Sequence, residues 1–137
     1  MKKVLIDTDV ILDSFLDRKP FSEFSTIILA MCENQKIQGF VTPVIFSHTY
    51  YILRRVGRHE KVIEKLTQLL SITNILSMDR NVIQQAIVSE FRDFEDALQN
   101  FAAVSSGNID VIVTRNIKDF KKSELGVLTP ESFLKII

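Results

Sequence analysis

The sequence predicts an α/β fold, a three-layer α/β/α sandwich whose central sheet is mostly parallel. Apolar, β-branched runs at 3–6 and 110–113 have the pattern of buried parallel strands. Strand patterns also alternate with helical periodicity along the whole chain. Parallel strands need crossover connections, and helices between successive strands supply them on both faces of a sheet.

The first half of the chain is predicted to contain two strands and four helices. In order these are a strand at 3–6, a helix at 10–16, a helix from 22 to about 31, a strand at 39–42, a helix from 43 to about 57 and a helix at 59–70. Ser22 is expected to be the N-cap of its helix, since a helical apolar pattern follows it. Pro43 suits the first turn of a helix, where its missing N–H costs nothing.

The second half is predicted to contain three strands and three helices. In order these are a strand at 74–77, a helix from 80 to about 90, a helix at 94–106, a strand at 111–113, a strand at 127–128 and a helix from 130. Asp79 and Thr129 have the residue types of N-caps. Gly107 is expected to be the C-cap of the helix at 94–106.

Length and composition indicate one globular domain over residues 1–137. Apolar residues make up 46% of the chain and charged residues 25%, which is ordinary for a globular protein. No apolar run approaches the roughly 18 residues of a membrane span, and no signal-peptide pattern is present. Cys32 is the only cysteine, which excludes an internal disulfide and suits a cytoplasmic protein.

The formal net charge of zero gives no overall support for nucleic-acid binding. Local clusters are more permissive, although such runs are more often solvated faces. One cluster contains Arg54, Arg55, Arg58 and Lys61, and the other contains Lys118, Lys121 and Lys122.

Acidic and amide side chains gather at three places where predicted elements begin or end. They are Asp7 and Asp9 after the first strand, Asp93 and Asp96 at a helix start, and Asn116 and Asp119 after the strand at 111–113. Each pair alone could be a turn or a helix cap. Ligand sites of open α/β sheets form beyond the carboxyl ends of the strands, so the pairs are expected to meet there. Clustered carboxylates repel one another unless a cation balances them, and oxygen ligands suit Mg²⁺ or Mn²⁺.

Four segments in order and spacing resemble the PIN domain family, a metal-dependent nuclease fold with small VapC-type toxins that cut RNA. They are Ile6-Asp7-Thr8-Asp9-Val10-Ile11-Leu12, Phe94-Glu95-Asp96-Ala97-Leu98, Ile112-Val113-Thr114-Arg115-Asn116-Ile117-Lys118-Asp119-Phe120 and Leu128-Thr129-Pro130-Glu131-Ser132-Phe133-Leu134. The resemblance implies a divalent-metal-dependent ribonuclease that forms a homodimer and is silenced by a small antitoxin protein.

The same resemblance implies the residues of the site. Asp7 resembles the first metal-binding acid, Asp96 the third, and Asp119 or the Asn116 position the fourth. Thr114 resembles the small hydroxyl residue that the family keeps beside the site.

Two positions depart from the family's pattern. His48 stands where the family usually has a Glu that binds the metal, and Asn116 stands where Asp is common. Imidazole binds Mn²⁺ or Zn²⁺ but is a poor ligand for Mg²⁺, so His48 is expected to be either a histidine satisfied by hydrogen bonds within the protein or a donor facing phosphate, and not a metal ligand. Arg54, Arg55 and Lys118 are further expected phosphate contacts.

Three hypotheses follow from the sequence. The first is a PIN-type ribonuclease that uses Asp7, Asp96 and Asp119. The second is a degenerate PIN fold that binds RNA or a protein partner without cutting, because His48 and Asn116 replace expected acids. The third is a small phosphatase with Asp7 as nucleophile, although Asp9 is followed by Val10-Ile11 and not by the usual Gly-Thr or Gly-Ser.

Overall fold

The computed structural model describes residues 1–137, which build a five-stranded sheet with every pair of neighbours parallel. The strand order is β3-β2-β1-β4-β5. The strands are β1 (Lys3–Ile6), β2 (Gln38–Val41), β3 (Thr73–Ile75), β4 (Val111–Val113) and β5 (Gly126–Leu128). The predicted parallel sheet is confirmed, and the observed strand ends lie within a residue or two of the predicted ones.

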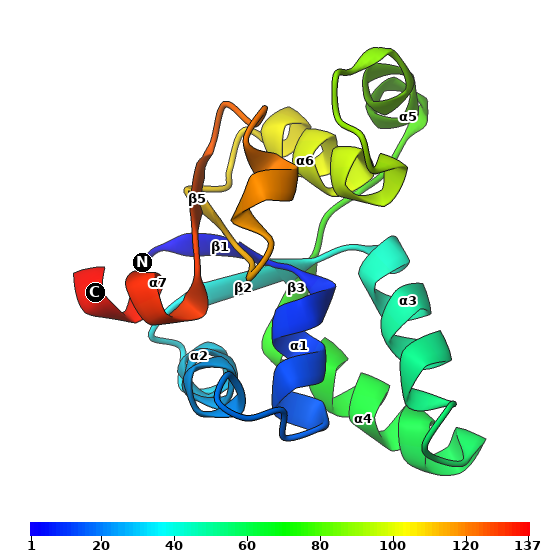
Figure 1. Ribbon diagram of the computed structural model, residues 1–137, viewed down its shortest axis with the longest axis vertical. Coiled ribbons are helices and arrows are strands. Elements are labelled where there is room, and N and C mark those ends of the chain that lie inside the picture. Colours follow the sequence, from blue (N-terminus) through cyan, green and yellow to red (C-terminus); the bar gives the residue numbers. More distant parts are fainter.

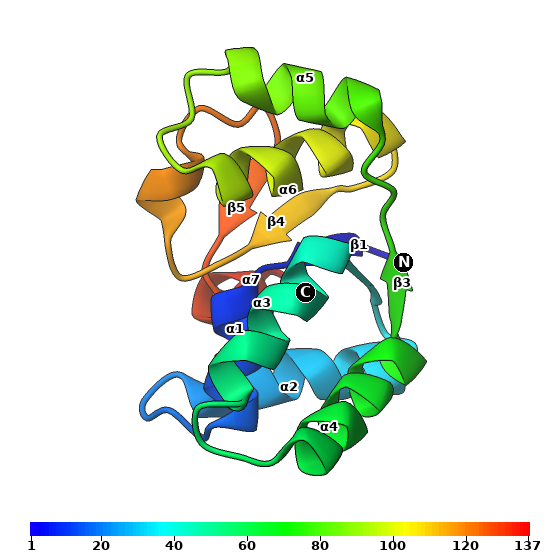
Figure 2. The same cartoon turned by 90° about the vertical axis from the view of Figure 1, so that its right-hand side faces the viewer.

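Helices cover both faces of the sheet, as Figures 1 and 2 show. They are α1 (Thr8–Phe15), α2 (Ser22–Glu33), α3 (Pro43–Leu53), α4 (His59–Ile72), α5 (Arg80–Val88), α6 (Phe94–Ser106) and α7 (Pro130–Ile136), with a short 3₁₀ helix η1 (Ile117–Phe120). The α5 and α6 pair lies on one side of the sheet, and α1, α2, α4 and α7 lie on the other (Figure 2). The three-layer α/β/α prediction is therefore confirmed. None of the helices combines the length and hydrophobicity needed to cross a membrane.

The two central strands carry the apolar runs that predicted them. Leu5, Ile6, Ile112 and Val113 are at most 1% exposed, because β1 and β4 are covered on both faces. Phe133 of α7 is fully buried in the same core. Burial of this kind supplies the main favourable free energy of the fold and fixes the position of the strand ends.

Three predicted helix ends have the expected chemistry. The Thr129 side chain accepts a hydrogen bond from the Ser132 N–H at 3.1 Å, with Pro130 in the first turn of α7. The Asp79 carboxylate accepts from Val82 N–H at the start of α5. Gly107 ends α6 in the left-handed region at φ 65°, where glycine has no Cβ penalty.

The prediction that Ser22 is an N-cap is wrong. Phe21 precedes α2 in the cap position without a side-chain capping bond, and Ser22 is the first helical residue. Its hydroxyl donates to the Asp17 carboxylate at 2.8 Å. Its backbone N–H is already bonded to the Arg18 carbonyl, so a turn before the helix supplies the partner that a cap would otherwise provide.

Several helix boundaries also differ from the prediction. Helix α3 ends at Leu53 and not near residue 57. Helix α1 begins directly at Thr8, because the Asp7 carboxylate accepts from the Thr8 N–H and its carbonyl accepts from Val10 N–H. Helix α5 ends at Val88, since Ser89 is extended and its hydroxyl donates back to the Ala86 carbonyl.

Strand β1 lies at the point where the order of the sheet reverses. It pairs with β2 on one side and with β4 on the other, with Ile6 opposite Val113. The chain crosses to opposite faces after these two strands, which opens a crevice beyond their carboxyl ends. Asp7 and Thr114 are the first residues past those ends.

Candidate active site

The register of β1 and β4 brings Asp7 and Thr114 together. The Asp7 N–H continues the strand ladder by donating to the Val113 carbonyl at 3.1 Å. The Thr114 hydroxyl donates to Asp7 Oδ2 at 2.8 Å, and Thr8 N–H donates to Asp7 Oδ1 at 2.8 Å. Both carboxylate oxygens of this buried aspartate are thus held in place.

Asp9 lies beside Asp7 on the first turn of α1. Its Oδ2 accepts from the Arg115 N–H at 3.1 Å and from the Thr114 hydroxyl at 3.4 Å. Its Oδ1 is buried without a hydrogen-bond partner, and so is the Thr8 hydroxyl. An unpaired buried carboxylate oxygen is costly, which marks this spot as one where a positive ligand would be stabilising.

The N-terminus of α6 supplies the acids of the opposite wall. Asp93 caps the helix by accepting from Asp96 N–H at 2.9 Å. Glu95 Oε1 and His48 Nδ1 lie 2.8 Å apart, which connects α6 to α3 across the site. Acids are favourable in a first helical turn because the backbone N–H groups there are unpaired.

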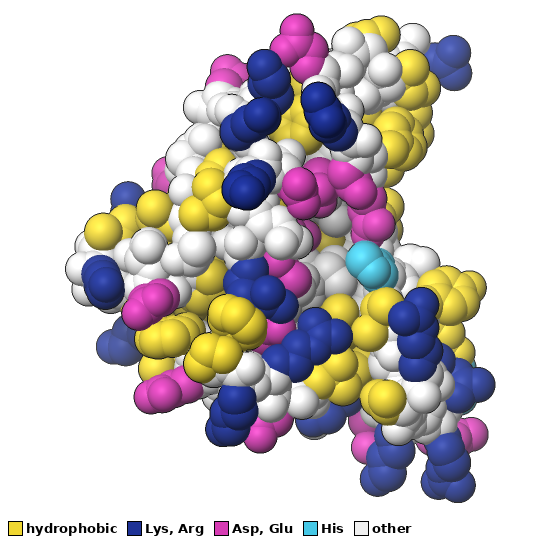
Figure 3. All heavy atoms as spheres, in the orientation of Figure 1, with side chains coloured by type: hydrophobic (Ala, Val, Ile, Leu, Met, Phe, Trp, Pro, Cys, Tyr) yellow, Lys and Arg dark blue, Asp and Glu magenta, His cyan; other side chains and the backbone are white.

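These side chains line one hollow of about 320 Å³. Its six carboxylates are Asp7, Asp9, Asp93, Glu95, Asp96 and Asp119. His48, Asn116, Arg18 and Thr8 complete the polar lining. Figure 3 shows the acidic side chains gathered in this hollow, with a histidine at its edge and basic side chains on either side.

Burial and crowding raise the pKa of three of these aspartates. Burial raises the pKa of Asp7, although the bonds from Thr114 and Thr8 partly offset this. Burial, and then the charge of Asp7, raises the pKa of Asp9 to about 7. Burial, and then the charges of Asp7 and three other nearby carboxylates, raises the pKa of Asp96 to about 8. The hollow therefore holds protons near neutral pH unless a cation replaces them.

The donor set of the hollow suits a hard divalent cation. Carboxylate oxygens are the ligands that Mg²⁺ and Mn²⁺ prefer, and the unpaired Asp9 Oδ1 is a free one. No three His, Cys, Asp or Glu side chains lie close enough together to hold an ion as they stand. The hollow thus fits a divalent cation in the chemistry of its ligands and in their common location, although the side chains are not yet at binding distance from one ion.

Most of the residues expected from the sequence lie at this one hollow. Asp7, His48, Asp96, Asn116 and Asp119 all line it, and Thr114 is bonded to Asp7 just beneath. Asn116 N–H also donates to the Thr114 hydroxyl at 3.0 Å. Residues from α3, α6 and the segments that follow β1 and β4 thus meet at one crevice.

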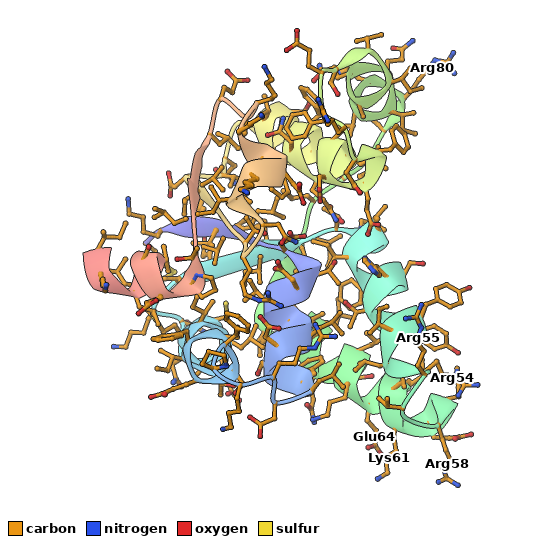
Figure 4. The ribbon with its side chains drawn as sticks, in the orientation of Figure 1. Arg54, Arg55, Arg58, Lys61, Glu64 and Arg80 are labelled. Carbon is orange, nitrogen blue, oxygen red and sulfur yellow. The ribbon has the colours of Figure 1, made fainter.

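Arg54 does not line the hollow. It follows the last residue of α3, and its guanidinium donates to the Gly57 carbonyl at 3.1 Å. Figure 4 shows Arg54, Arg55, Arg58 and Lys61 pointing outward at the end of the molecule away from the strand ends.

Sequence reasoning missed a buried ion pair beneath the site. The Asp13 carboxylate is fully buried on α1 and pairs with Arg115 and, at 3.6 Å, with Arg18. Asp13 lies four residues after Asp9, so helical spacing places both on one side of α1, and this spacing could have revealed it. Glu95 was likewise given no role, and only the three-dimensional approach of α3 to α6 reveals its contact with His48.

Comparison of the sequence with known proteins finds one family and a similar relative. The sequence model of the PIN domain family matches residues 3–118. Ribonuclease VapC1 from Aquifex aeolicus is 25% identical over 137 aligned residues, which cover 96% of this chain and 93% of the relative.

Solved structures share the fold at low identity. A toxin-antitoxin complex from Klebsiella pneumoniae has a chain that superposes with a TM-score of 0.68 at 21% identity, covering 93% of this chain and 97% of that one. VapC20 from Mycobacterium tuberculosis, a Sarcin-Ricin loop cleaving toxin, superposes with a TM-score of 0.61 at 14% identity, covering 80% and 86%. Since the family's sequence pattern matches most of its length, this chain belongs to the PIN domain family.

Proposed function

We propose that this chain is a divalent-metal-dependent endoribonuclease of the VapC type, which hydrolyses RNA phosphodiesters. The observation that carries the proposal is the convergence of six carboxylates on one hollow at the switch point of the sheet. Such a hollow repels a phosphodiester unless cations occupy it, and this combination is characteristic of metal-assisted phosphoryl chemistry.

Asp7, Asp96 and Asp119 would hold Mg²⁺ or Mn²⁺. When bound, the ion would supply an activated water and stabilise negative charge on the phosphate. The chain's own part is to position the ligands. Thr114 holds the Asp7 carboxylate by its 2.8 Å hydrogen bond, and the capping bond that Asp93 accepts from Asp96 N–H fixes the turn of α6 that carries Asp96.

His48 and Asn116 would contact the substrate. The Glu95 carboxylate accepts from His48 Nδ1–H and so orients the ring, and in the imidazolium form Nε2–H would donate to a phosphate oxygen. Asn116 lies at the rim of the same hollow, where its amide can donate to a sugar or phosphate.

The similar solved structures indicate which partner this chain would bind. A structurally similar chain belongs to a toxin-antitoxin complex, so a small antitoxin protein is the expected binding partner of this chain. The chain would act as a homodimer and cut RNA in the cytoplasm. Its single cysteine, Cys32, is free, which is compatible with a reducing compartment.

A second candidate is a PIN fold that binds RNA without cutting it. Two observations favour it. His48 occupies the position where the resemblance expects a carboxylate, and no three candidate ligands stand close enough to hold an ion as they are.

One experiment separates the two candidates. Labelled single-stranded RNA is incubated with the protein in Mg²⁺, in Mn²⁺ and in chelator, while metal binding is measured separately by calorimetry. Cleavage that requires a metal and is lost in Asp96→Asn supports the nuclease. RNA that is bound but stays intact in both metals supports the non-cutting candidate.

A further inference from the structure

A second and larger cavity adjoins the acidic hollow. Its volume is about 520 Å³, and it shares Asp93 and Asp119 with the hollow. Its other lining is mainly basic: Arg92, Lys118, Lys121 and Lys122. We call this cavity the flanking pocket.

Two segments form the walls of the flanking pocket, and both are anchored to α6. Phe91, in the segment before α6, packs edge-on against Phe101 and Phe120, with ring centroids 5.9 and 6.1 Å apart. The segment after η1 is held by Ser123, whose hydroxyl donates to the buried Asn100 side chain at 2.5 Å. The basic side chains therefore project from a fixed frame.

Three of the four cations of the flanking pocket carry no ion pair. Lys122 pairs with Glu90 at 3.3 Å, whereas Arg92, Lys118 and Lys121 form no salt bridge. These positive charges lie directly beside the acidic hollow. Because the formal net charge of the chain is zero, they form a local basic surface and do not reflect an overall basic protein. An RNA strand with one phosphate at the hollow has further phosphates next to it, and these need cations near by.

We propose that the flanking pocket binds the sugar-phosphate backbone of the RNA strand beside the bond that is cut. This proposal rests on the proposed nuclease function and names how its substrate is held. The cationic ends of Lys118, Lys121 and Arg92 contact the phosphates. Contacts to phosphate carry no sequence information, so the flanking pocket adds affinity equally to RNAs of different sequence.

The test compares two double variants that remove the same charge. Lys118→Ala/Lys121→Ala removes two cations of the flanking pocket, and Arg55→Ala/Arg58→Ala removes two exposed cations at the far end of α3 and α4 (Figure 4). Both are made in the Asp7→Asn background, and RNA integrity is checked on a gel. Binding of a labelled single-stranded RNA is followed by anisotropy between about 50 and about 200 mM salt.

The pocket variant should bind more weakly, and its plot of log affinity against log salt should be shallower by about 1.4, since each phosphate contact on a single strand contributes about 0.7. The control should keep the original slope. Glu90→Gln should tighten binding, because it frees Lys122. Equal slopes for the two double variants, or no binding of RNA by any form, would overturn the proposal.

The two proposals fail in different ways. If RNA stays intact in both Mg²⁺ and Mn²⁺, the nuclease function is overturned, but the two double variants can still be compared by how their RNA affinity depends on salt. Metal-dependent cleavage with equal salt slopes keeps the nuclease and overturns the flanking pocket.

Discussion

Arg115 donates two hydrogen bonds to the fully buried carboxylate of Asp13, from Nε at 2.5 Å and from a terminal nitrogen at 2.9 Å. The guanidinium also lies over the ring of Phe21 at 4.0 Å, and the backbone N–H of the same residue donates to Asp9. One arginine thus ties the end of β4 to helix α1, directly beneath the hollow. Neither Arg115 nor Asp13 lines the hollow itself, so this charge pair supports the site from outside it.

Arg115→Ala should destabilise the protein by about 3 kcal/mol, because it leaves the Asp13 carboxylate buried with only the partly exposed Arg18 at 3.6 Å. Arg18→Ala is the matched control, and it should cost less than about 1 kcal/mol because the bidentate pair survives. Urea unfolding measures both changes. Equal losses from the two variants would show that the Arg115 pair does not carry the stability.

Asp7→Asn should lower metal-dependent RNA cleavage by at least about 100-fold, because a metal-binding carboxylate is lost. The amide oxygen can still accept from Thr8 N–H, so the fold should remain intact, and relief of repulsion should make it slightly more stable in chelator. Asp79→Asn, at the N-cap of the outer helix α5, is the control and should leave cleavage unchanged. A sharp fall in melting temperature for Asp7→Asn without metal would show that the main role of Asp7 is its capping of α1 and not the binding of metal.

Stability of the metal-free protein should fall as the pH rises from about 4 to about 8. In the folded state the pKa of Asp9 is raised to about 7 and that of Asp96 to about 8, both from the ordinary value of 3.8. Across this window the folded state binds more protons than the unfolded one, so the free energy of unfolding decreases with pH. Thermal melts in chelator measure the slope, and Asp96→Asn should flatten it.

Added Mg²⁺ or Mn²⁺ should raise the melting temperature more at pH 8 than at pH 5, because the ion binds deprotonated carboxylates. A stability in chelator that rises with pH would contradict the raised pKa values. Equal stabilisation by metal at both pH values would show that the ion binds outside the acidic hollow.

The sheet was predictable because its central strands are buried on both faces and therefore read as unbroken apolar runs. Leu5 and Ile112 belong to such runs, and their burial follows from the sequence pattern alone. Helix starts with a side-chain cap were predictable from local residue preferences, as at Asp79 and Thr129. The start of α2 was not, since the partner of Ser22 N–H is a carbonyl of the preceding turn, which local residue preferences do not reveal.

The site residues that follow strands were predictable from the sequence. The contacts that depend on how two helices pack against each other were not. Asp7 and Thr114 each follow a strand, so pairing of β1 with β4 places them side by side. The contact of His48 with Glu95 requires the relative position of α3 and α6, which periodicity does not encode. Charge runs are ambiguous for a similar reason: the run that begins at Arg54 points away from the hollow, and the run at Lys118 borders it.

His48→Glu should tighten binding of Mg²⁺ by at least about tenfold, since it adds a hard, charged oxygen to the lining of the hollow. In chelator the same variant should melt at a lower temperature, because the new carboxylate faces Glu95 where the imidazole now bonds to it. His48→Gln is the matched control: its amide can still donate to Glu95, and metal affinity should stay as it is. Calorimetric titration with Mg²⁺ and Mn²⁺ compares the three forms. If His48→Glu binds neither ion more tightly than His48→Gln, position 48 does not face the metal, and its place in the family's pattern is misassigned.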